Sequence, residues 1–551
     1  MLKQRGRIVL GWVATVGMVS ACGGGPVQEA PKKTADKEAA APGDYRPDGI
    51  IARSLPEIST ALRAGETTSE ELTQAYLDRI DAIDRAGPTL QAVLAINPHA
   101  LDDAKALDEA FAKGEIVGPL HGVPILLKDN IESADPMATT AGSFALMENV
   151  TGRDSPLVAG LREQGAIILG KTNLSQWANF RSSDSMSGWS SLGGQVRNPH
   201  ILDRNPCGSS SGSGVAAAAS LAAGTVGTET NGSIICPSNV NGIVGFKPTV
   251  GLVPQDLIVP ISSSQDTAGP MTKTVSGAAM MLTAMAKGGT GIDYSARLSE
   301  NALQGVRVGV MRFATGSNHD IHMAFDTSLA IMDEAGAELI EIDSFDGPET
   351  DNFWDKALTV LEYEFKATLN DYLANAAPAV VSRTLVDVIA FNDDNAGEEL
   401  TLFGQDTMVS SEARGDLTDT EYLEALRDVQ TATRQNGIDK LLAQYRVDVL
   451  VAPSGPVAPR VDPINGDVWP DWAGAGYLAA VAGYPHLTVP MGTIDGIPVG
   501  LSFMGASGED AQVLSYGFAF EQASNARVEP QYLPTAEAQP DIAAAMARKD
   551  R

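Results

Sequence analysis

The sequence predicts an α/β fold in which a large, twisted, mixed but mostly parallel sheet carries helices on both faces. After Gly114, short apolar runs bounded by Gly, Pro or Asp alternate with helical patterns, which is typical of strand–helix–strand units. Near the end of the chain, the runs 487–491 and 499–504 flank Asp495-Gly496, a hairpin turn pair, so an antiparallel segment should close the sheet. The other buried strands are expected at 123–127, 166–169, 305–310, 337–342 and 447–451.

Three early helices follow from capping and spacing signals. Thr68 and Glu71 form a capping-box pattern, and apolar residues then recur on one helical face: Leu72, Tyr76, Ile80 and Ile83. Asn97-Pro98 begins a second helix, which Gly114 ends. Residues 215–223 form a third, which ends at Gly224.

One domain accounts for most of the 551 residues. We assign residues 49–538 to it, because no internal segment resembles a linker and no repeat is found. Its stretch 301–437 is more helical and is expected to form a cap. Residues 23–48 are rich in Gly, Pro, Ala and Lys, so we expect a disordered linker. Residues 539–551 are assigned as a C-terminal tail.

The first 22 residues indicate export. Three basic residues precede an apolar run at 8–19, which is too short for a bilayer-spanning helix and fits a signal peptide. Val19-Ser20-Ala21-Cys22 resembles the lipobox of bacterial lipoproteins, which implies lipidation of Cys22. We therefore expect a protein on the periplasmic side of the cell envelope, with membrane contact through its lipid only. The alternatives are an uncleaved anchor or a plain secretory signal.

The charge excludes one class of function. The formal net charge is −30, and no basic stripe interleaved with aromatic residues is present, so a nucleic-acid partner is not expected. Cys207 and Cys236 are the other two cysteines. They could form a bridge or a redox control in an exported protein, but we favour buried, unpaired thiols.

A Gly/Ser-rich segment at 207–214 precedes the helical run at 215–223. Alone it could be a phosphate cradle or a flexible loop. Residues 208–212 also match G-x-S-x-G, the nucleophile elbow of α/β-hydrolases, with Ser210 as nucleophile. An elbow needs a buried strand before it, whereas residues 203–206 are polar and contain a proline.

Two further motifs change the interpretation. Residues 227–233 read G-T-E-T-N-G-S, and Lys128 ends the apolar run 123–127. Together with the Gly/Ser-rich segment they resemble the amidase signature family. The resemblance extends to residues 170–174, 264–270 and 482–485, and the runs 177–181 and 188–190 are similar to those of bacterial peptide amidases.

The resemblance implies a large mixed-sheet amidase fold and a set of site residues. It places the nucleophile at Ser233, a proton-relaying serine with a cis peptide bond at Ser209, and the base at Lys128. The amides that stabilise the oxyanion and contact substrate fall on Thr230, Asn231, Gly232 and Ser233. It also implies hydrolysis of an amide to an acid and ammonia through an acyl-enzyme, without a cofactor. C-terminal peptide amides or related small amides are the expected substrates.

The residue types suit this chemistry. A serine attacking an amide must lose its proton to a base poised near the working pH. Lysine serves only when neutral, and burial lowers its pKa because desolvation penalises the charged form; the run 123–127 offers Lys128 such surroundings. Backbone N–H groups of 230–233 would meet the developing oxyanion.

Two positions depart from the family pattern. Asn231 and Ile235 stand where many members have Gly and Arg, which leaves the local architecture and the substrate open. His121 could be catalytic, but we favour a structural role. No metal is expected, because no H-E-x-x-H pair or Cys/His cluster is present. Of the aromatic residues in the peptide-amidase-like runs, Trp177, Phe180 and Trp189 could equally line a pocket or fill the core.

Three rival functions remain. The chain could be an α/β-hydrolase esterase that uses Ser210, or a non-catalytic lipoprotein that binds envelope peptides. The amidase component of a tRNA-dependent amidotransferase fits an exported, acidic chain less well. A monomer is favoured for the oligomeric state.

Overall fold

The computed structural model describes residues 45–286, 291–347 and 352–547, all within one compact unit. The predicted signal peptide, Cys22 and most of the predicted linker lie outside the described residues. Nowhere in these three ranges is a helix both long and apolar enough to cross a membrane.

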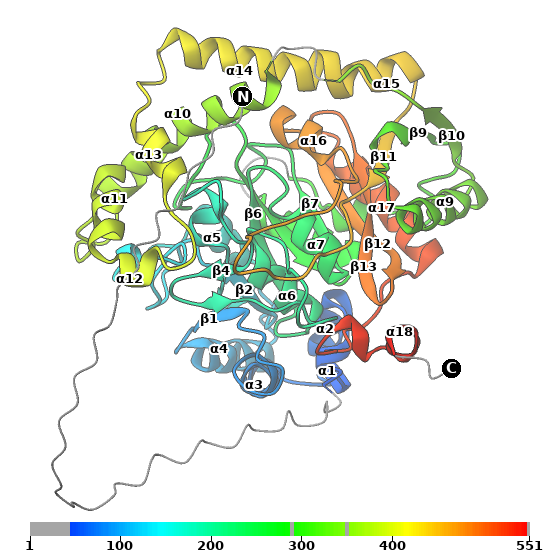
Figure 1. Ribbon diagram of the computed structural model, residues 1–551. Coiled ribbons are helices and arrows are strands. Elements are labelled where there is room, and N and C mark those ends of the chain that lie inside the picture. Colours follow the sequence, from blue (N-terminus) through cyan, green and yellow to red (C-terminus); the bar gives the residue numbers. More distant parts are fainter. Residues whose placement is uncertain (1–44, 287–290, 348–351, 548–551) are drawn as a thin grey trace, which may run out of the picture. The chain divides into compact units, whose positions relative to one another are not determined.

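An eleven-stranded sheet forms the centre of the fold (Figure 1). Its strands, in spatial order, are β1 (Val93–Ile96), β3 (Ile167–Thr172), β2 (Pro124–Lys128), β6 (Gly224–Glu229), β8 (Thr267–Thr272), β7 (Val244–Lys247), β12 (His486–Ile494), β13 (Ile497–Met504), β11 (Val449–Pro453), β9 (Arg307–Met311) and β10 (Glu338–Ile342). The predicted large mixed sheet is confirmed, and all seven predicted strands are present.

The sheet is less parallel than predicted. Four strand pairings are parallel, namely β2 with β3 and β6, and β9 with β10 and β11. The other six are antiparallel. The difference arises in the centre, where β7 and β8 are short, glycine-containing strands that lack a long apolar run.

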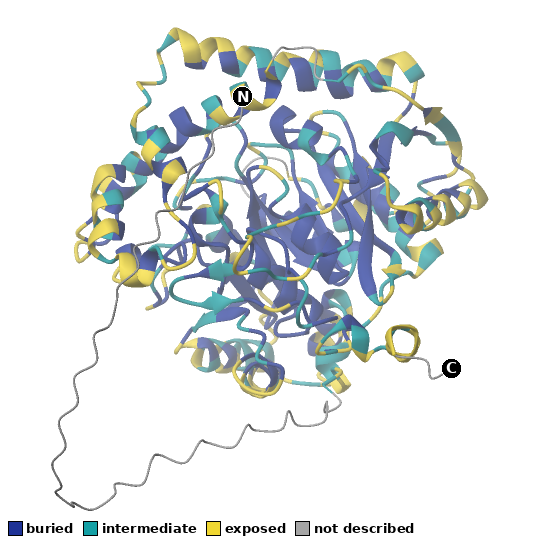
Figure 2. Ribbon diagram, in the orientation of Figure 1, coloured by how far each residue is buried: buried dark blue, intermediate teal, exposed yellow. Residues whose placement is uncertain are grey.

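Helices flank the sheet and bury it (Figure 2). Strands β2, β3, β6, β7, β8, β11 and β13 are buried along their whole length. Strand β10 lies at an edge of the sheet, and Ile342 is its one fully buried residue. The helices outside the cap region are α1 (Gly49–Ala52), α2 (Leu55–Ala64), α3 (Ser69–Arg79), α4 (Ala100–Ala112), α5 (Pro156–Glu163), α6 (Ser211–Ala218), α7 (Ile235–Asn241), α8 (Val275–Met285), α9 (His319–Glu334), α15 (Asp439–Tyr445), α16 (Gly476–Ala482), α17 (Asp510–Ser524) and α18 (Pro540–Met546).

The predicted helix starts agree with the structure where capping signals exist. Thr68 caps α3, and its side chain accepts a hydrogen bond from the Glu71 amide while Glu71 reaches back to Thr68. The helix predicted at 215–223 instead begins at Ser211 and ends at Ala218. The Gly/Ser-rich segment therefore supplies the first turn of α6.

Only part of the region 301–437, the predicted helical cap, consists of helices alone. Its first third contributes β9, α9 and β10 to the main fold. The remaining helices lie along the top and the left side of the molecule in Figure 1: α10 (Phe353–Ala374), α11 (Leu385–Asp394), α12 (Ala396–Glu399), α13 (Asp406–Glu412) and α14 (Thr420–Thr433). Phe365 and Leu369 of α10 pack with Trp177 and Phe180 in a common apolar cluster.

Segments just outside both predicted domain boundaries have defined structure. Tyr45 lies within the predicted linker, yet its ring packs edge-on against Tyr532 with centroids 5.7 Å apart. Its carbonyl oxygen accepts a hydrogen bond from Arg79 at 2.9 Å. Burial of the large Tyr45 ring stabilises this contact with the domain. Helix α18 lies in the predicted tail and buries none of its residues.

Candidate active site

Lys128 lies at the end of β2, the third strand in the sheet order. The side chain is fully buried. Its Nζ donates to the Oγ of Ser209 at 2.7 Å and to the Oγ1 of Thr228 at 2.8 Å, and lies 3.3 Å from the Thr228 carbonyl. The parallel pairing of β2 with β6 positions these groups, since Thr228 lies near the end of β6.

The surroundings of Lys128 favour its neutral form. Burial lowers its pKa to about 7, although the negative charges of Asp266 and Glu229 oppose the shift. Two other lysines, Lys171 and Lys247, are equally buried. They hydrogen-bond to the carbonyls of Ile131 and Pro248, respectively. Of these three lysines only Lys128 contacts a serine hydroxyl.

Ser209 lies in the loop before α6. The peptide bond between Gly208 and Ser209 is cis, in agreement with what the resemblance implies. The Ser209 carbonyl accepts a hydrogen bond from the Ser175 amide at 3.1 Å, and Ser209 is buried. Its hydroxyl is held against Lys128 by this loop.

Ser210 has a different environment from Ser209. Its hydroxyl donates to the Thr228 carbonyl at 3.0 Å and accepts from the Thr228 amide at 3.2 Å. Because its side chain is fully buried between these two backbone groups, the Ser210 hydroxyl joins the loop to β6 and is not free to attack a substrate. The nucleophile-elbow alternative at 208–212 has no structural support, because a loop and not a strand precedes these residues.

Ser233 lies in the loop between β6 and α7, with 9% of its surface exposed. Its carbonyl accepts a hydrogen bond from the Ser210 amide at 3.2 Å, which brings the two serine loops together. The Oε2 atom of Glu229 accepts from the amides of Ile234 and Ile235 at 2.7 and 3.0 Å. This carboxylate fixes the backbone directly after Ser233.

The residues before Ser233 are anchored on one side and open on the other. Thr230 donates to Asp266 at 2.6 Å, and burial raises the pKa of Asp266 to about 6. Asn231 is exposed and Gly232 half-buried, and both line a cavity. Gly232 has φ +81°, a conformation that a residue with a Cβ adopts at a cost.

A disulfide joins the loop that carries Ser209 to the first turn of α7, which directly follows the loop that carries Ser233. Cys207 and Cys236 are bonded, with their Cα atoms 5.8 Å apart, so our preference for unpaired thiols is wrong. Cys207 precedes the cis peptide, and Cys236 follows Ser233 by three residues. Helix α6 and strand β6 lie between the two cysteines and bring them close together in the fold. A separation of 29 residues in the sequence does not indicate this proximity.

The two loops open onto a cavity of about 550 Å³. Its lining includes Gly208, Asn231 and Gly232, which are sequence neighbours of Ser209 and Ser233. Sequence reasoning missed its aromatic residues, because they come from segments far apart in the chain: Trp354, Trp469, Trp472 and Tyr477. The carboxylates of Glu229 and Asp467 also line it.

The aromatic residues proposed from the sequence lie elsewhere. Trp177 and Phe180 are buried in the apolar cluster shared with α10. Trp189 packs edge-on against Phe403, with ring centroids 5.3 Å apart. None of the three lines the cavity. The core interpretation holds for Trp177 and Phe180, whereas Trp189 is half-buried.

His121 is a structural histidine. Its Nδ1 accepts a hydrogen bond from the Val117 amide, and its Nε2 bonds with the Leu107 carbonyl, both at 3.2 Å. Within the residues that the structure describes, no three His, Cys, Asp or Glu side chains are grouped so as to hold a metal ion.

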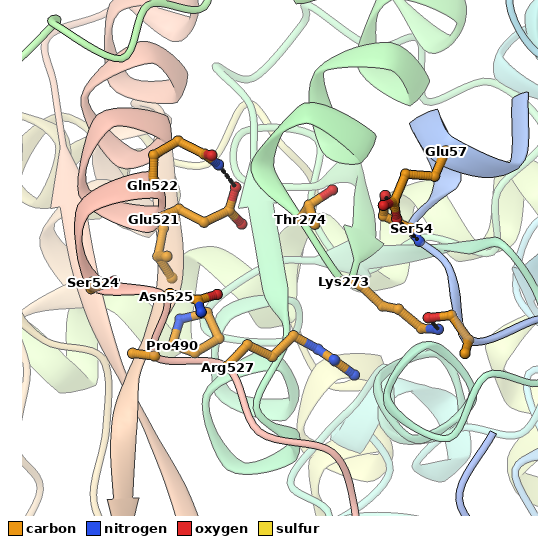
Figure 3. A pocket seen from close by; sticks show the side chains of 13 residues that line it. Ser54, Glu57, Lys273, Thr274, Pro490, Glu521, Gln522, Ser524, Asn525 and Arg527 are labelled. Atoms are coloured by element: carbon orange, nitrogen blue, oxygen red, sulfur yellow. Dashed lines mark hydrogen bonds between the residues drawn. The ribbon is translucent and has the colours of Figure 1, made fainter. Parts of the chain in front are cut away.

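A second cavity, of about 470 Å³, lies away from the serine loops (Figure 3). It is lined by residues at the start of α2, after β8 and at the end of α17. Lys273 there donates to the carbonyls of Ile51 and Ala52, each at 3.0 Å, and Glu521 accepts from the Val275 amide at 2.8 Å. These charged groups connect elements of the fold, and no sequence-predicted site residue lies among them.

The buried lysine–serine pair lies directly beside loops that line a cavity, an arrangement suited to a serine hydrolase with a lysine base. The family model described as Amidase matches residues 71–514, and the chain therefore belongs to the amidase signature family. It is a hydrolase that acts on amide C–N bonds.

Individual relatives span almost the same length. The crystal structure of the peptide amidase from Stenotrophomonas maltophilia has 45% sequence identity and a TM-score of 0.81, covering 87% of this chain and 98% of that one. A probable amidase of Arabidopsis thaliana is 36% identical over 88% of this chain and 92% of its own. A glutamyl-tRNA(Gln) amidotransferase component of Thermoanaerobacter pseudethanolicus is 31% identical over 88% of this chain and 98% of its own.

Proposed function

We propose that this amidase hydrolyses C-terminal peptide amides or related small amides through an acyl-enzyme on Ser233, with Ser209 as proton relay and Lys128 as base. The observation that carries the proposal is the 2.7 Å contact between Lys128 Nζ and Ser209 Oγ, made by a fully buried lysine with a pKa of about 7. At neutral pH such a lysine is present in its neutral form to a large extent, so its lone pair can accept a proton.

The proton moves in opposite directions in the two halves of acylation. As Ser233 Oγ bonds to the amide carbon, its proton passes to Ser209 Oγ, and the Ser209 proton passes to Lys128 Nζ. When the carbon–nitrogen bond breaks, the proton returns through Ser209 to the leaving nitrogen, which departs as ammonia. Water then attacks the ester on Ser233 by the same relay and releases the acid.

Backbone amides of 230–233 would stabilise the oxyanion. Loss of one such donor typically lowers the rate by about 10² to 10³. The loop is held by Thr230 on Asp266 and by Glu229 on the residues after Ser233, so its donors are positioned before the substrate binds. Asn231 can still offer its N–H where many members have Gly.

Two observations support a peptide amide as substrate. The relative at 45% identity is a peptide amidase. The cavity of about 550 Å³ beside the serine loops has the size of a site for a molecule much larger than a simple amide. The Ser210 hydroxyl is hydrogen-bonded to the backbone of Thr228, which disfavours the esterase alternative with Ser210 as nucleophile.

The test is ammonia release from a panel of amides that contains peptide amides, free aliphatic amides and aryl acylamides. Ser233→Ala is the blank. Peptide amides should turn over fastest, and no turnover above the blank for any amide would contradict the proposal.

We also propose that the protein is exported and lipidated at Cys22. The basic start, the apolar run 8–19 and the small residues before Cys22 support this. Labelled fatty acid should attach to the wild-type protein in a bacterial host and not to Cys22→Ala. Equal labelling of both proteins would contradict the proposal.

A further inference from the structure

Aromatic side chains from separate segments flank the cavity beside the serine loops. Trp469 and Trp472, in the loop before α16, have ring centroids 5.6 Å apart at 66°. Trp354 of α10 and Tyr477 of α16 are 5.1 Å apart. Trp354 and Trp472 are exposed, so these rings present open faces and edges to a molecule that enters.

The charges of the cavity have one sign. Glu229 and Asp467 line it, and no lysine or arginine of the described ranges does so. His486 also lines it, but burial lowers its pKa to about 3, so that ring is neutral. The lining therefore contains two acidic residues and no lysine or arginine, and of the two acidic residues only Asp467 is partly exposed.

Both carboxylates are held in place. Asp467 accepts from the Ser187 amide at 3.0 Å and from the Asn205 side chain at 2.8 Å, and it remains partly exposed. Glu229 is almost fully buried, and its Oε1 atom has no hydrogen-bond partner among the described residues. Because this oxygen is itself buried, Asp467 is the carboxylate that a ligand in the cavity can reach, while Glu229 adds negative charge nearby.

Tryptophan faces beside carboxylates are the surroundings that attract a cation, since the ring quadrupole and the negative charge act in the same direction. We propose that this cavity binds a positively charged side chain of the substrate, so that the enzyme prefers amides of lysine or arginine. The proposal rests on the peptide amide function above. A neutral aromatic residue would use the rings but leave Asp467 without a counter-charge, and an acidic residue would be repelled.

The test compares substrates that differ in charge but little in size. N-acetyl-lysine amide and N-acetyl-norleucine amide share a four-carbon side chain, and the α-amide of N-acetyl-glutamate supplies the opposite charge. The wild-type kcat/KM, measured by ammonia release, should favour the lysine over the norleucine substrate by about tenfold, with the glutamate substrate slowest.

Two variants and a matched control locate the effect. Asp467→Asn should bring the lysine-to-norleucine ratio of kcat/KM close to one, because kcat/KM for the lysine substrate should fall much more than kcat/KM for the norleucine substrate. Glu229 is a poorer probe, because its charge also acts on Lys128. Asp471→Asn removes an exposed charge from the same loop outside the cavity, and should keep the wild-type ratio. If Asp467→Asn loses norleucine activity through misfolding, Trp472→Leu at the exposed rim should lower the ratio instead.

The outcomes separate this inference from the proposed function. Equal wild-type rates on the lysine and norleucine amides would overturn the charge preference while leaving the peptide amidase function intact. A wild-type ratio unaltered in both Asp467→Asn and Trp472→Leu would also overturn it. Absence of ammonia from all three substrates would contradict the proposed function itself.

Discussion

Cys207 and Cys236 form a disulfide that joins the loop carrying Ser209 to the first turn of α7, directly after the loop carrying Ser233. One cysteine lies two residues before the proposed relay, and the other lies three residues after the proposed nucleophile. Both also line the substrate cavity. The relative position of the two hydroxyls therefore depends on a covalent link as well as on hydrogen bonds.

Removal of this link should lower stability and activity together. For a separation of 29 residues, loop-closure entropy gives about 3 to 4 kcal/mol of stability. The double variant Cys207→Ser/Cys236→Ser should unfold at lower urea concentration, and its kcat should fall more than its KM rises, because the serines lose their alignment. Unchanged unfolding and kcat would contradict this role.

The paired serines should differ sharply on substitution. Ser210→Ala removes two hydrogen bonds to Thr228 and should lower the free energy of unfolding by about 1 to 3 kcal/mol, while kcat falls by less than tenfold. Ser209→Ala should lower kcat by about 10² to 10⁴ because the relay is lost. Steady-state ammonia release and urea unfolding measure both effects. The esterase alternative predicts the reverse order of activities.

Lys128→Met should change stability in a pH-dependent way. The pKa of Lys128 falls from its usual value near 10.5 to about 7 on folding, so between these values the unfolded chain binds more protons. Wild-type stability should therefore rise with pH in this window, by at most about 1.4 kcal/mol per pH unit from this residue. The difference in unfolding free energy between wild type and Lys128→Met should grow in favour of wild type from pH 7.5 to 9.5. A constant difference would argue against a shifted pKa.

The parts of the site that the sequence predicted depend on short, local patterns. Lys128 follows an apolar run that forms β2, and Ser209 and Ser233 lie in glycine-containing loops whose motifs resemble a family. Local apolar runs likewise predicted β9 and β11. Residues close in sequence determine these features, so they can be recognised without knowledge of the fold.

Features that depend on tertiary contacts were not predictable. Trp354, Trp469 and Tyr477 come together from three segments, and nothing in their spacing indicates a common cavity. The pairing of Cys207 with Cys236 depends on how α6 and β6, which lie between them, pack in the fold. The central antiparallel strands β7 and β8 lack a long apolar run, so no local pattern predicts them. They are buried because neighbouring strands and helices cover them.

The pH dependence of kcat/KM for a peptide amide tests most directly whether neutral Lys128 is the base. A lysine that must be unprotonated, with a pKa of about 7, predicts a rate that rises about tenfold per pH unit below pH 7 and levels off above it. The same profile should be absent from the residual activity of Lys128→Met. A wild-type rate that is constant from pH 5 to 9, or that falls above pH 7, would contradict the account.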